Sequence, residues 1–171
     1  TTASDTAAIA FTSGLTSTYA EYIFGFYNMR AAADDREWTF QVSTNGGSSY
    51  GVAITSAHHH AHHKEDNSGT PNVNQDSGHH LAQSTSYQKL TASQGNDADQ
   101  QCSGVMRLFN PASTTYVKHF MSELNFSALT DYTDHCFNAG YVNTTSEVNA
   151  INFKFNSGNV DAGTIKLYGI A

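Results

Sequence analysis

The chain is 171 residues long, and only 13% of its residues are charged, with a formal net charge of −7 and a pI near 5.6. This acidity argues against a general nucleic-acid-binding protein, which needs a basic face, and no apolar run approaches the ~20 residues that span a membrane. The 19 threonines, 18 serines, 14 asparagines and 13 glycines are typical of an all-β protein with many turns, and the length suits one domain with its own core.

The first 18 residues differ from the rest of the chain in having few large side chains. Residues 1–18 are small and polar, with Ile9, Phe11 and Leu15 as their only sizeable apolar side chains. We expect them to form an extended arm that contributes one strand. Residues 19–171 show no internal repeat and no linker, and are expected to form a single β-sandwich domain.

The first strand is predicted over Glu21–Met29, which is apolar on both faces. Side chains alternate across a strand, so three aromatic residues share one face and three further apolar residues share the other. The first set is Tyr22, Phe24 and Phe26, and the second is Ile23, Tyr27 and Met29. Such a strand lies between two layers or faces a partner chain.

A hairpin is predicted over Trp38–Ser56. Its turn would be Asn45-Gly46-Gly47, the strongest short turn signal in the chain, because a tight hairpin needs positive φ at its central residues. Apolar residues alternate with small or polar ones on both sides. They are Trp38, Phe40 and Val42 before the turn and Tyr50, Val52 and Ile54 after it.

The hydrophobic pattern disappears between Ala57 and Gly78. This segment holds the run His58-His59-His60-Ala61-His62-His63 and then a polar stretch, and long segments of this kind are either functional or disordered. A short strand is predicted near Tyr87–Leu90, before a second polar loop over Gln94–Gln101.

A second hairpin, which we expect to be central in the fold, is predicted over Gly104–Leu124. Apolar residues flank Asn110-Pro111, and Asn-Pro initiates turns because proline restricts its own φ and the conformation of the residue before it. His119 alternates with Val117 and Met121, which favours a hydrogen-bonded core histidine.

Three further strands are predicted over Cys136–Val142, Val148–Asn156 and Gly163–Ile170. In the second of them, Ile151, Phe153 and Phe155 are expected to face inward. The total is eight or nine short strands, without a convincing amphipathic helix. The sequence therefore predicts an all-β fold, an antiparallel β-sandwich that is jelly-roll-like.

The two cysteines, Cys102 and Cys136, are too few for a disulfide framework. Both lie beside predicted strands, where cysteine most often packs as a small apolar side chain. We expect free thiols, although a disulfide would depend on a Cα separation that the sequence does not define.

Three segments carry a family resemblance: STNGGSSYGVAITS, LFNPASTTYVKHF and AGYVNTTSEVNAINFKFNSGNVDAGTIKLYGIA. Together they resemble a group of marine bacteriophage virion-associated proteins, small domains that typically end in Gly-Thr-Ile-Lys-Leu-Tyr-Gly-Ile, here Gly163–Ile170. The resemblance covers the chain from about Phe11 onward. It implies a β-sandwich protein of a phage particle, in a tail fibre or on the capsid, and it transfers no catalytic residues. The histidine run is not part of the shared pattern.

Five of the nine histidines lie in His58–His63. If the run continues the preceding strand, His58, His60 and His62 share one face. His-x-His pairs from three chains would surround one octahedral metal ion at a threefold axis, and the resemblance implies this arrangement because trimeric phage spikes and fibres use such pairs. Imidazole suits zinc, nickel, copper or iron. We take His58, His60 and His62 as candidate metal ligands at an oligomer axis, with no cofactor otherwise required.

Other interpretations of the histidine run remain open. It could be a solvated polar loop that binds metal adventitiously, or a pH-sensitive interface, since clustered histidines repel one another when protonated near about pH 6. It could also serve a metal-dependent hydrolase together with Asp66, although it lacks the glutamate of His-Glu-x-x-His. The acidic pairs Asp97 with Asp99 and Asp131 with Asp134 lie in expected loops, as solvated residues or as Ca²⁺ ligands.

The sequence thus predicts a non-enzymatic protein of the virion surface that forms a homo-oligomer, most simply a trimer. In one version, a receptor-binding module of the tail fibre contacts host-surface glycan through loops over His58–Gly78 and Gln94–Gln101. In the other, a capsid-decoration module meets other virion proteins through the face with Ile23, Tyr27 and Met29. A hydrolase using His58–His63 is the alternative. No nucleic-acid partner and no membrane insertion are expected.

Overall fold

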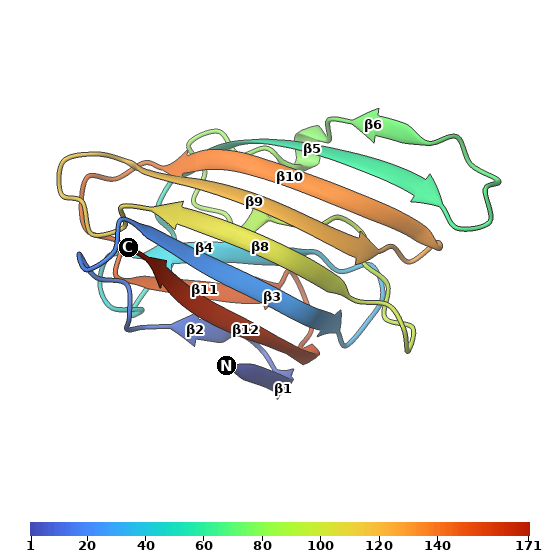
Figure 1. The fold of residues 1–171 in the computed structure, drawn as a ribbon, viewed down its shortest axis with the longest axis horizontal. Coiled ribbons are helices and arrows are strands. Elements are labelled where there is room, and N and C mark those ends of the chain that lie inside the picture. Colours follow the sequence, from blue (N-terminus) through green and yellow to red (C-terminus); the bar gives the residue numbers. More distant parts are fainter.

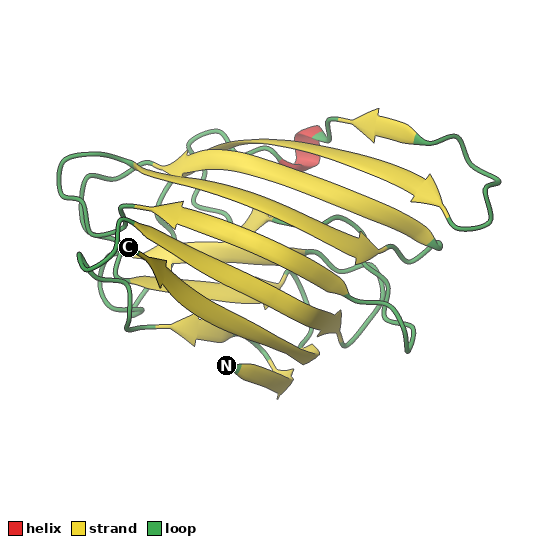
Figure 2. Ribbon diagram, viewed as in Figure 1, coloured by secondary structure: helices red, strands yellow, loops and turns green.

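The computed structural model describes residues 1–171, which form β-strands joined by loops (Figures 1 and 2). The one helix is a single 3-10 turn, η1 (Ser77–His79), and no helix has the length and apolar character to cross a membrane. The strands are β1 (Thr2–Thr6), β2 (Ile9–Phe11), β3 (Glu21–Ala31), β4 (Trp38–Ser43), β5 (Ile54–Lys64), β6 (Asn72–Asn74), β7 (Gln88–Lys89), β8 (Cys102–Phe109), β9 (Lys118–Ser127), β10 (Tyr132–Val142), β11 (Ala150–Phe155) and β12 (Val160–Ile170).

The strands form two antiparallel sheets of unequal size. The large sheet has the order β1-β12-β3-β8-β9-β10-β5-β6, and the small sheet has the order β2-β11-β4-β7. In Figure 1 the small sheet lies behind β3, β8 and β12 of the large sheet. This arrangement confirms the predicted all-β antiparallel sandwich. It has 12 strands instead of eight or nine, because strands as short as β2 and β6, of three residues each, show no pattern in the sequence. The two-residue strand β7 lies within the short strand predicted near Tyr87–Leu90.

Aromatic side chains from both sheets meet in the core. Phe153 of β11 faces inward as predicted, and its ring centroid lies 5.1 Å from that of Phe24 and 5.2 Å from that of Phe26, both on β3. Trp38 of β4 stacks on Phe153 with an interplanar angle of 13°. These rings are fully buried, so the alternation of side chains along β3, β4 and β11 determines which faces of these strands meet in the core.

The predicted central hairpin is confirmed. Strands β8 and β9 pair from Cys102 opposite Phe126 to Leu108 opposite Phe120, and they occupy the middle of the large sheet. The even-numbered residues of β9 face the core. His119 and Met121 therefore lie on the opposite, exposed face, which corrects the expectation of a core histidine.

The predicted hairpin over Trp38–Ser56 is wrong. Gly46 and Gly47 do form a turn, with φ of 69° and 85°, but the chain then crosses from the small sheet to the large one, where Ile54 begins β5. Residues 50–53 form no strand; the carbonyl of Val52 instead accepts a hydrogen bond from the buried amide of Gln41. A local turn signal therefore predicts that the chain turns, but it does not predict which sheet the chain enters after the turn.

A β-bulge changes the outward face of β3. Asn28 has φ of 52°, and the pairing register of β3 with β8 shifts between Phe26 and Met29. Met29 is therefore fully buried, whereas Tyr27 stays exposed. The predicted set of Ile23, Tyr27 and Met29 on one outward face is incorrect at Met29.

The first 18 residues join both sheets instead of contributing one strand. β1 pairs with β12 in the large sheet and β2 pairs with β11 in the small sheet. Leu15 and Ile9 are buried in the shared core. The segment expected to be an arm thus closes one side of the sandwich.

Gly140 allows β10 and β5 to approach each other. A Cβ at this position would lie 2.4 Å from the carbonyl oxygen of Thr55 and 2.9 Å from Cα of Ser56. We expect Gly140→Ala to lower the free energy of unfolding by about 1–3 kcal/mol, as overpacked positions do, measured by urea denaturation. The neighbouring Ala139→Ser, which adds an atom on the exposed face, should change it by less than about 0.5 kcal/mol. Equal effects of the two substitutions would contradict this role of Gly140.

Candidate functional site

The histidine run is a strand. It forms most of β5, which pairs with β10 along its whole length, with His58 opposite Asn138, His60 opposite Cys136 and His62 opposite Asp134. These three histidines share the inward face, as predicted for a strand, while His59 and His63 lie on the other face. His58 is only 1% exposed. The alternative of a solvated polar loop is therefore incorrect for this run.

The inward face of β5 is covered by η1 and the residues after it. Figure 2 shows the short helix beside β5, and Gln88 of β7 donates a hydrogen bond to the carbonyl of His79 in η1 at 3.0 Å. The His79 ring stacks on the His58 ring at a centroid distance of 4.6 Å and an angle of 20°. Further along, the backbone N–H of Ser56 donates to the carbonyl of Leu81 at 2.9 Å. This cover closes the inner face of β5 over His58.

The protonation state of His58 follows from its hydrogen bonds. Its Nδ1 lies 2.9 Å from Oδ1 of Asn138, and the amide nitrogen of Asn138 donates to the hydroxyl of Ser122 at 3.1 Å. Because the amide oxygen only accepts, the proton of the neutral ring is on Nδ1. Nε2 is then a bare acceptor, buried and without a hydrogen-bond partner. Burial lowers the pKa of His58 to about 4, so the ring is neutral at pH 7.

His60 lies next along the same face and contacts a carboxylate of β10. Its Nδ1 is 2.9 Å from each carboxylate oxygen of Asp134. Asp134 is itself nearly buried, and its Oδ1 lies 3.9 Å from the thiol of Cys136. Burial and the neighbouring carboxylate both raise the pKa of the Cys136 thiol, which is therefore protonated. Cys102 and Cys136 are both free and buried, as predicted.

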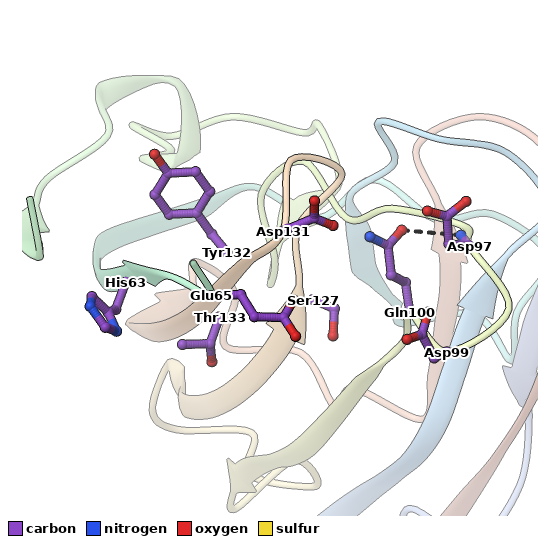
Figure 3. Close-up of a pocket in the computed structure, with 9 residues that line it drawn as sticks. All are labelled: His63, Glu65, Asp97, Asp99, Gln100, Ser127, Asp131, Tyr132 and Thr133. Atoms are coloured by element: carbon purple, nitrogen blue, oxygen red, sulfur yellow. Dashed lines mark hydrogen bonds between the residues drawn. The ribbon is translucent and has the colours of Figure 1, made fainter. Parts of the chain in front are cut away.

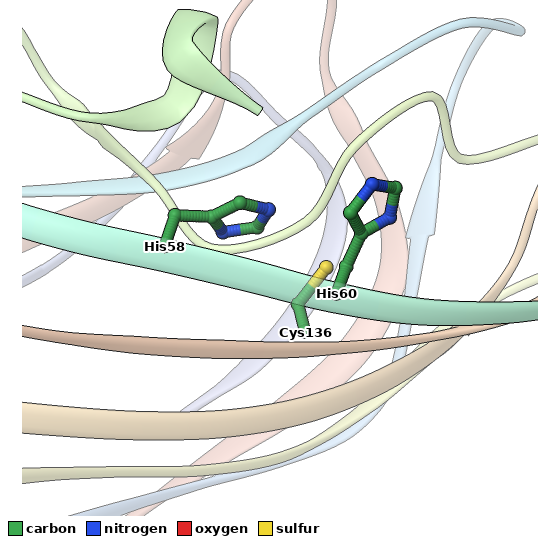
Figure 4. A group of neighbouring side chains, drawn as sticks. All are labelled: His58, His60 and Cys136. Carbon is green, nitrogen blue, oxygen red and sulfur yellow. The ribbon is translucent and has the colours of Figure 1, made fainter. Parts of the chain in front are cut away.

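Two overlapping groups of metal-ligating side chains result. His58, His60 and Cys136 form one, and His60, His62 and Asp134 form the other; within each group, one ligand atom per residue lies within 4.8 Å of the others. Figure 4 shows the thiol of Cys136 directed between the rings of His58 and His60. The group of His58, His60 and Cys136, called the inner group, is closed by η1. A cavity of about 290 Å³, lined by His62, Asp134 and Tyr132 among others, opens over the outer group of His60, His62 and Asp134.

The geometry does not fit the predicted arrangement at an oligomer axis. The His58 ring faces the interior of its own chain under His79, so it cannot meet copies of itself at a symmetry axis. Asp66 does not join the inward histidines either. Its carboxylate accepts from the backbone of Ser68 at 2.8 Å and lies 3.4 Å from Nζ of Lys64.

Sequence reasoning missed the contribution of β10 to this site. Asp134, Cys136 and Asn138 are spaced by two, so they share the inward face of one strand. The strand was expected to begin at Cys136, and Asp134 was expected in a loop with Asp131. Extending the alternation two residues toward the N-terminus would have placed all three side chains on one face of a strand, whereas their position opposite the histidine run depends on the pairing with β5.

A second cavity lies at the far end of β5, where loops from distant parts of the sequence meet. It has a volume of about 470 Å³ and is shown in Figure 3. Gln100 holds its wall, because its side chain accepts from the backbone N–H of Asp97 at 3.1 Å and donates to the carbonyl of Ala128 at 3.2 Å. Its lining residues are His63, Glu65, Asp97, Asp99, Gln100, Ser127, Asp131, Tyr132 and Thr133. The two predicted acidic pairs thus rearrange: Asp131 joins Asp97 and Asp99, whereas Asp134 lies at the histidines.

The fold and these two sites define an all-β sandwich protein with a polar, histidine-lined inner face at one end of its large sheet. Comparison of the chain with protein-family models, with curated proteins and with solved structures gives no match. The resemblance to phage virion-associated proteins therefore stays a prediction from the sequence segments that carry it.

Proposed function

We propose that the protein is a non-enzymatic surface protein of a bacteriophage particle and acts in host adsorption. The observation that carries this proposal is the cavity of Figure 3, where the loop after β5 and the loop before β8 meet. The same two loops are those expected from the sequence to contact host glycan. The sequence resemblance supplies the phage context, and a rigid sandwich that presents loops at one end suits a binding module.

The chemistry of the cavity suits a carbohydrate. Carboxylates of Glu65, Asp97 and Asp99 can accept hydrogen bonds from sugar hydroxyls, and the amide and hydroxyl groups of the lining both donate and accept. Tyr132 adds an aromatic ring with a polar tip at the rim. The acidic lining disfavours anionic ligands. A neutral or cationic host-surface polysaccharide is therefore the proposed ligand.

Binding of the labelled protein to host cells tests this proposal. We expect Asp99→Asn combined with Glu65→Gln to weaken binding at least tenfold, a change of about 1.4 kcal/mol that the loss of two charged acceptors readily supplies. Glu147→Gln, an exposed substitution outside the cavity, is the matched control. Isolated host polysaccharide should compete with the cells. Equal binding by the double variant and the control would refute the cavity as the adsorption site.

Capsid decoration is the second candidate, and the outer face of the large sheet favours it. Tyr27 and Tyr168 are each 44% exposed there and Met121 is 55% exposed. Tyr168 on β12 is opposite Ile23 on β3 in the pairing register, so apolar side chains continue across these two strands, and Arg107 on β8 separates them from Met121 on β9. Contact through this face would also support the proposed homo-oligomer, a trimer in its simplest form. Gold-labelled antibodies on purified particles separate the candidates: label at the tail favours adsorption, and label over the capsid favours decoration.

A metal-dependent hydrolase remains as an alternative of another class. The outer group of His60, His62 and Asp134, open to the cavity over β5, favours it more than the predicted set with Asp66 does. Two imidazoles and a carboxylate leave open positions on a metal ion for water. Zinc-dependent turnover of a chromogenic ester that disappears in His60→Gln would support this alternative over a binding module.

A further inference from the structure

One buried ring nitrogen of the protein is a hydrogen-bond acceptor that has no donor. Nε2 of His58 is unprotonated, because Nδ1 carries the proton toward Asn138. It is also buried and without a hydrogen-bond partner. A buried acceptor left unpaired is destabilising, because it has lost its hydrogen bonds to water without gaining another. Such an atom is retained at little cost if a ligand occupies the space that it faces.

Two further donor atoms face the same space. Three donor atoms all lie within 4.8 Å of one another: Sγ of Cys136, a ring nitrogen of His60 and a ring nitrogen of His58. Cys136 and His60 are directly opposed in the pairing of β5 with β10, and His58 is the next inward residue along β5. Backbone pairing of β5 with β10 therefore sets the separation of the three donors (Figure 4).

The groups behind these donors are oriented as they are behind metal ligands. A ligating histidine usually donates its second ring N–H to a carboxylate or amide oxygen, which fixes the tautomer and the ring orientation. His58 has this contact with Asn138, and His60 has it with Asp134, each at 2.9 Å. Asn138 is in turn held by the hydroxyl of Ser122. Both rings are thus positioned before any ligand arrives.

We propose that His58, His60 and Cys136 bind one thiophilic transition-metal ion, Zn²⁺ or copper, within a single chain. A thiolate with two imidazoles selects these ions over Ca²⁺ and Mg²⁺, which take oxygen ligands. The metal displaces the thiol proton of Cys136, which passes to solvent, and forms a metal–sulfur bond without any change in oxidation state. His60 lies at the boundary with the cavity over β5, through which the ion enters.

Cobalt is the probe that distinguishes this site from its neighbour. Co²⁺ is titrated into chelator-treated, dialysed protein under reducing conditions and followed by absorption. We expect one ion per chain with a thiolate-to-cobalt charge-transfer band in the near ultraviolet, and its displacement by Zn²⁺. Cys136→Ser should abolish the band. Asn138→Ala should weaken binding about 10–100-fold, as loss of a group that orients a ligand does.

The controls use residues next to the site. Cys102→Ser changes the other fully buried cysteine, and His59→Gln changes the outward residue between the two ligating histidines; both should keep the band. His60→Gln keeps the test valid if Cys136→Ser fails to fold, because the His60 side chain is partly exposed and its loss should also abolish the band. Cobalt bound without the band would place it at His62 and Asp134 and overturn the proposal, as would an absence of binding. Neither result bears on binding to host cells.

Discussion

Replacing Phe153 with alanine should lower the free energy of unfolding by about 3–5 kcal/mol, the usual range for a buried phenylalanine. Its ring lies between the two sheets and contacts aromatic rings from three other strands. Those rings are Phe11 of β2, Phe24 and Phe26 of β3, and Trp38 and Phe40 of β4. A cavity at this point removes contacts from both sheets, and the surrounding rings are too rigid to collapse into it.

Urea denaturation of the parent protein and of the Phe153→Ala variant at pH 7.5 measures this loss. A matched control is Phe137→Ala, which removes the same atoms from the outward face of β10, where the ring stacks on His59. We expect that control to lower the free energy of unfolding by less than about 1.5 kcal/mol, because the ring is only partly buried. Similar losses at the two positions would mean that the sheets do not share the core described above.

The metal-free protein should lose stability as the pH falls from 6.5 toward 4, and His58 should account for roughly 3 kcal/mol of that loss. Burial lowers the pKa of His58 in the folded state to about 4, from 6.5. Within this window the unfolded chain binds a proton that the folded chain excludes. The contribution is therefore complete above pH 6.5 and disappears as the pH approaches the folded-state value.

The charged groups around His58 do not reverse this sign. His60 on the same strand and His79 on η1 both disfavour its protonation, and Asp76 at the start of η1 favours it less strongly than burial opposes it. Burial also lowers the pKa of His79, so this ring adds a loss in the same direction. The carboxyl pKa of Asp76 is lowered below 3.8, so Asp76 titrates at a lower pH than the window between 6.5 and 4.

Urea denaturation with EDTA at several pH values between 7.5 and 4 tests the prediction. His58→Gln should flatten the dependence in this window, while His119→Gln, which changes an exposed histidine of β9, should leave it as in the parent protein. Carboxylates that titrate at low pH act on all three proteins alike. An unchanged dependence in His58→Gln would show that His58 is protonated without loss of packing.

Features that depend on neighbouring residues could be predicted from the sequence. Alternation placed Phe153 and its neighbours in the core of an all-β sandwich, Asn110-Pro111 located the central hairpin, and period-two spacing put His58, His60 and His62 on one face. Each of these follows from side-chain geometry within a strand or turn, which acts over a few residues.

The choice of neighbouring strands, in contrast, depends on the tertiary structure. The turn at Gly46 and Gly47 exists, but the chain after it joins the other sheet, because pairing partners are chosen by the whole fold. The same is true of the histidines: His60 meets Asp134, a residue 74 positions away in the sequence. Residues that far apart leave no joint pattern in a single sequence, so the contact between β5 and β10 turned a polar run into a buried cluster of ligating side chains.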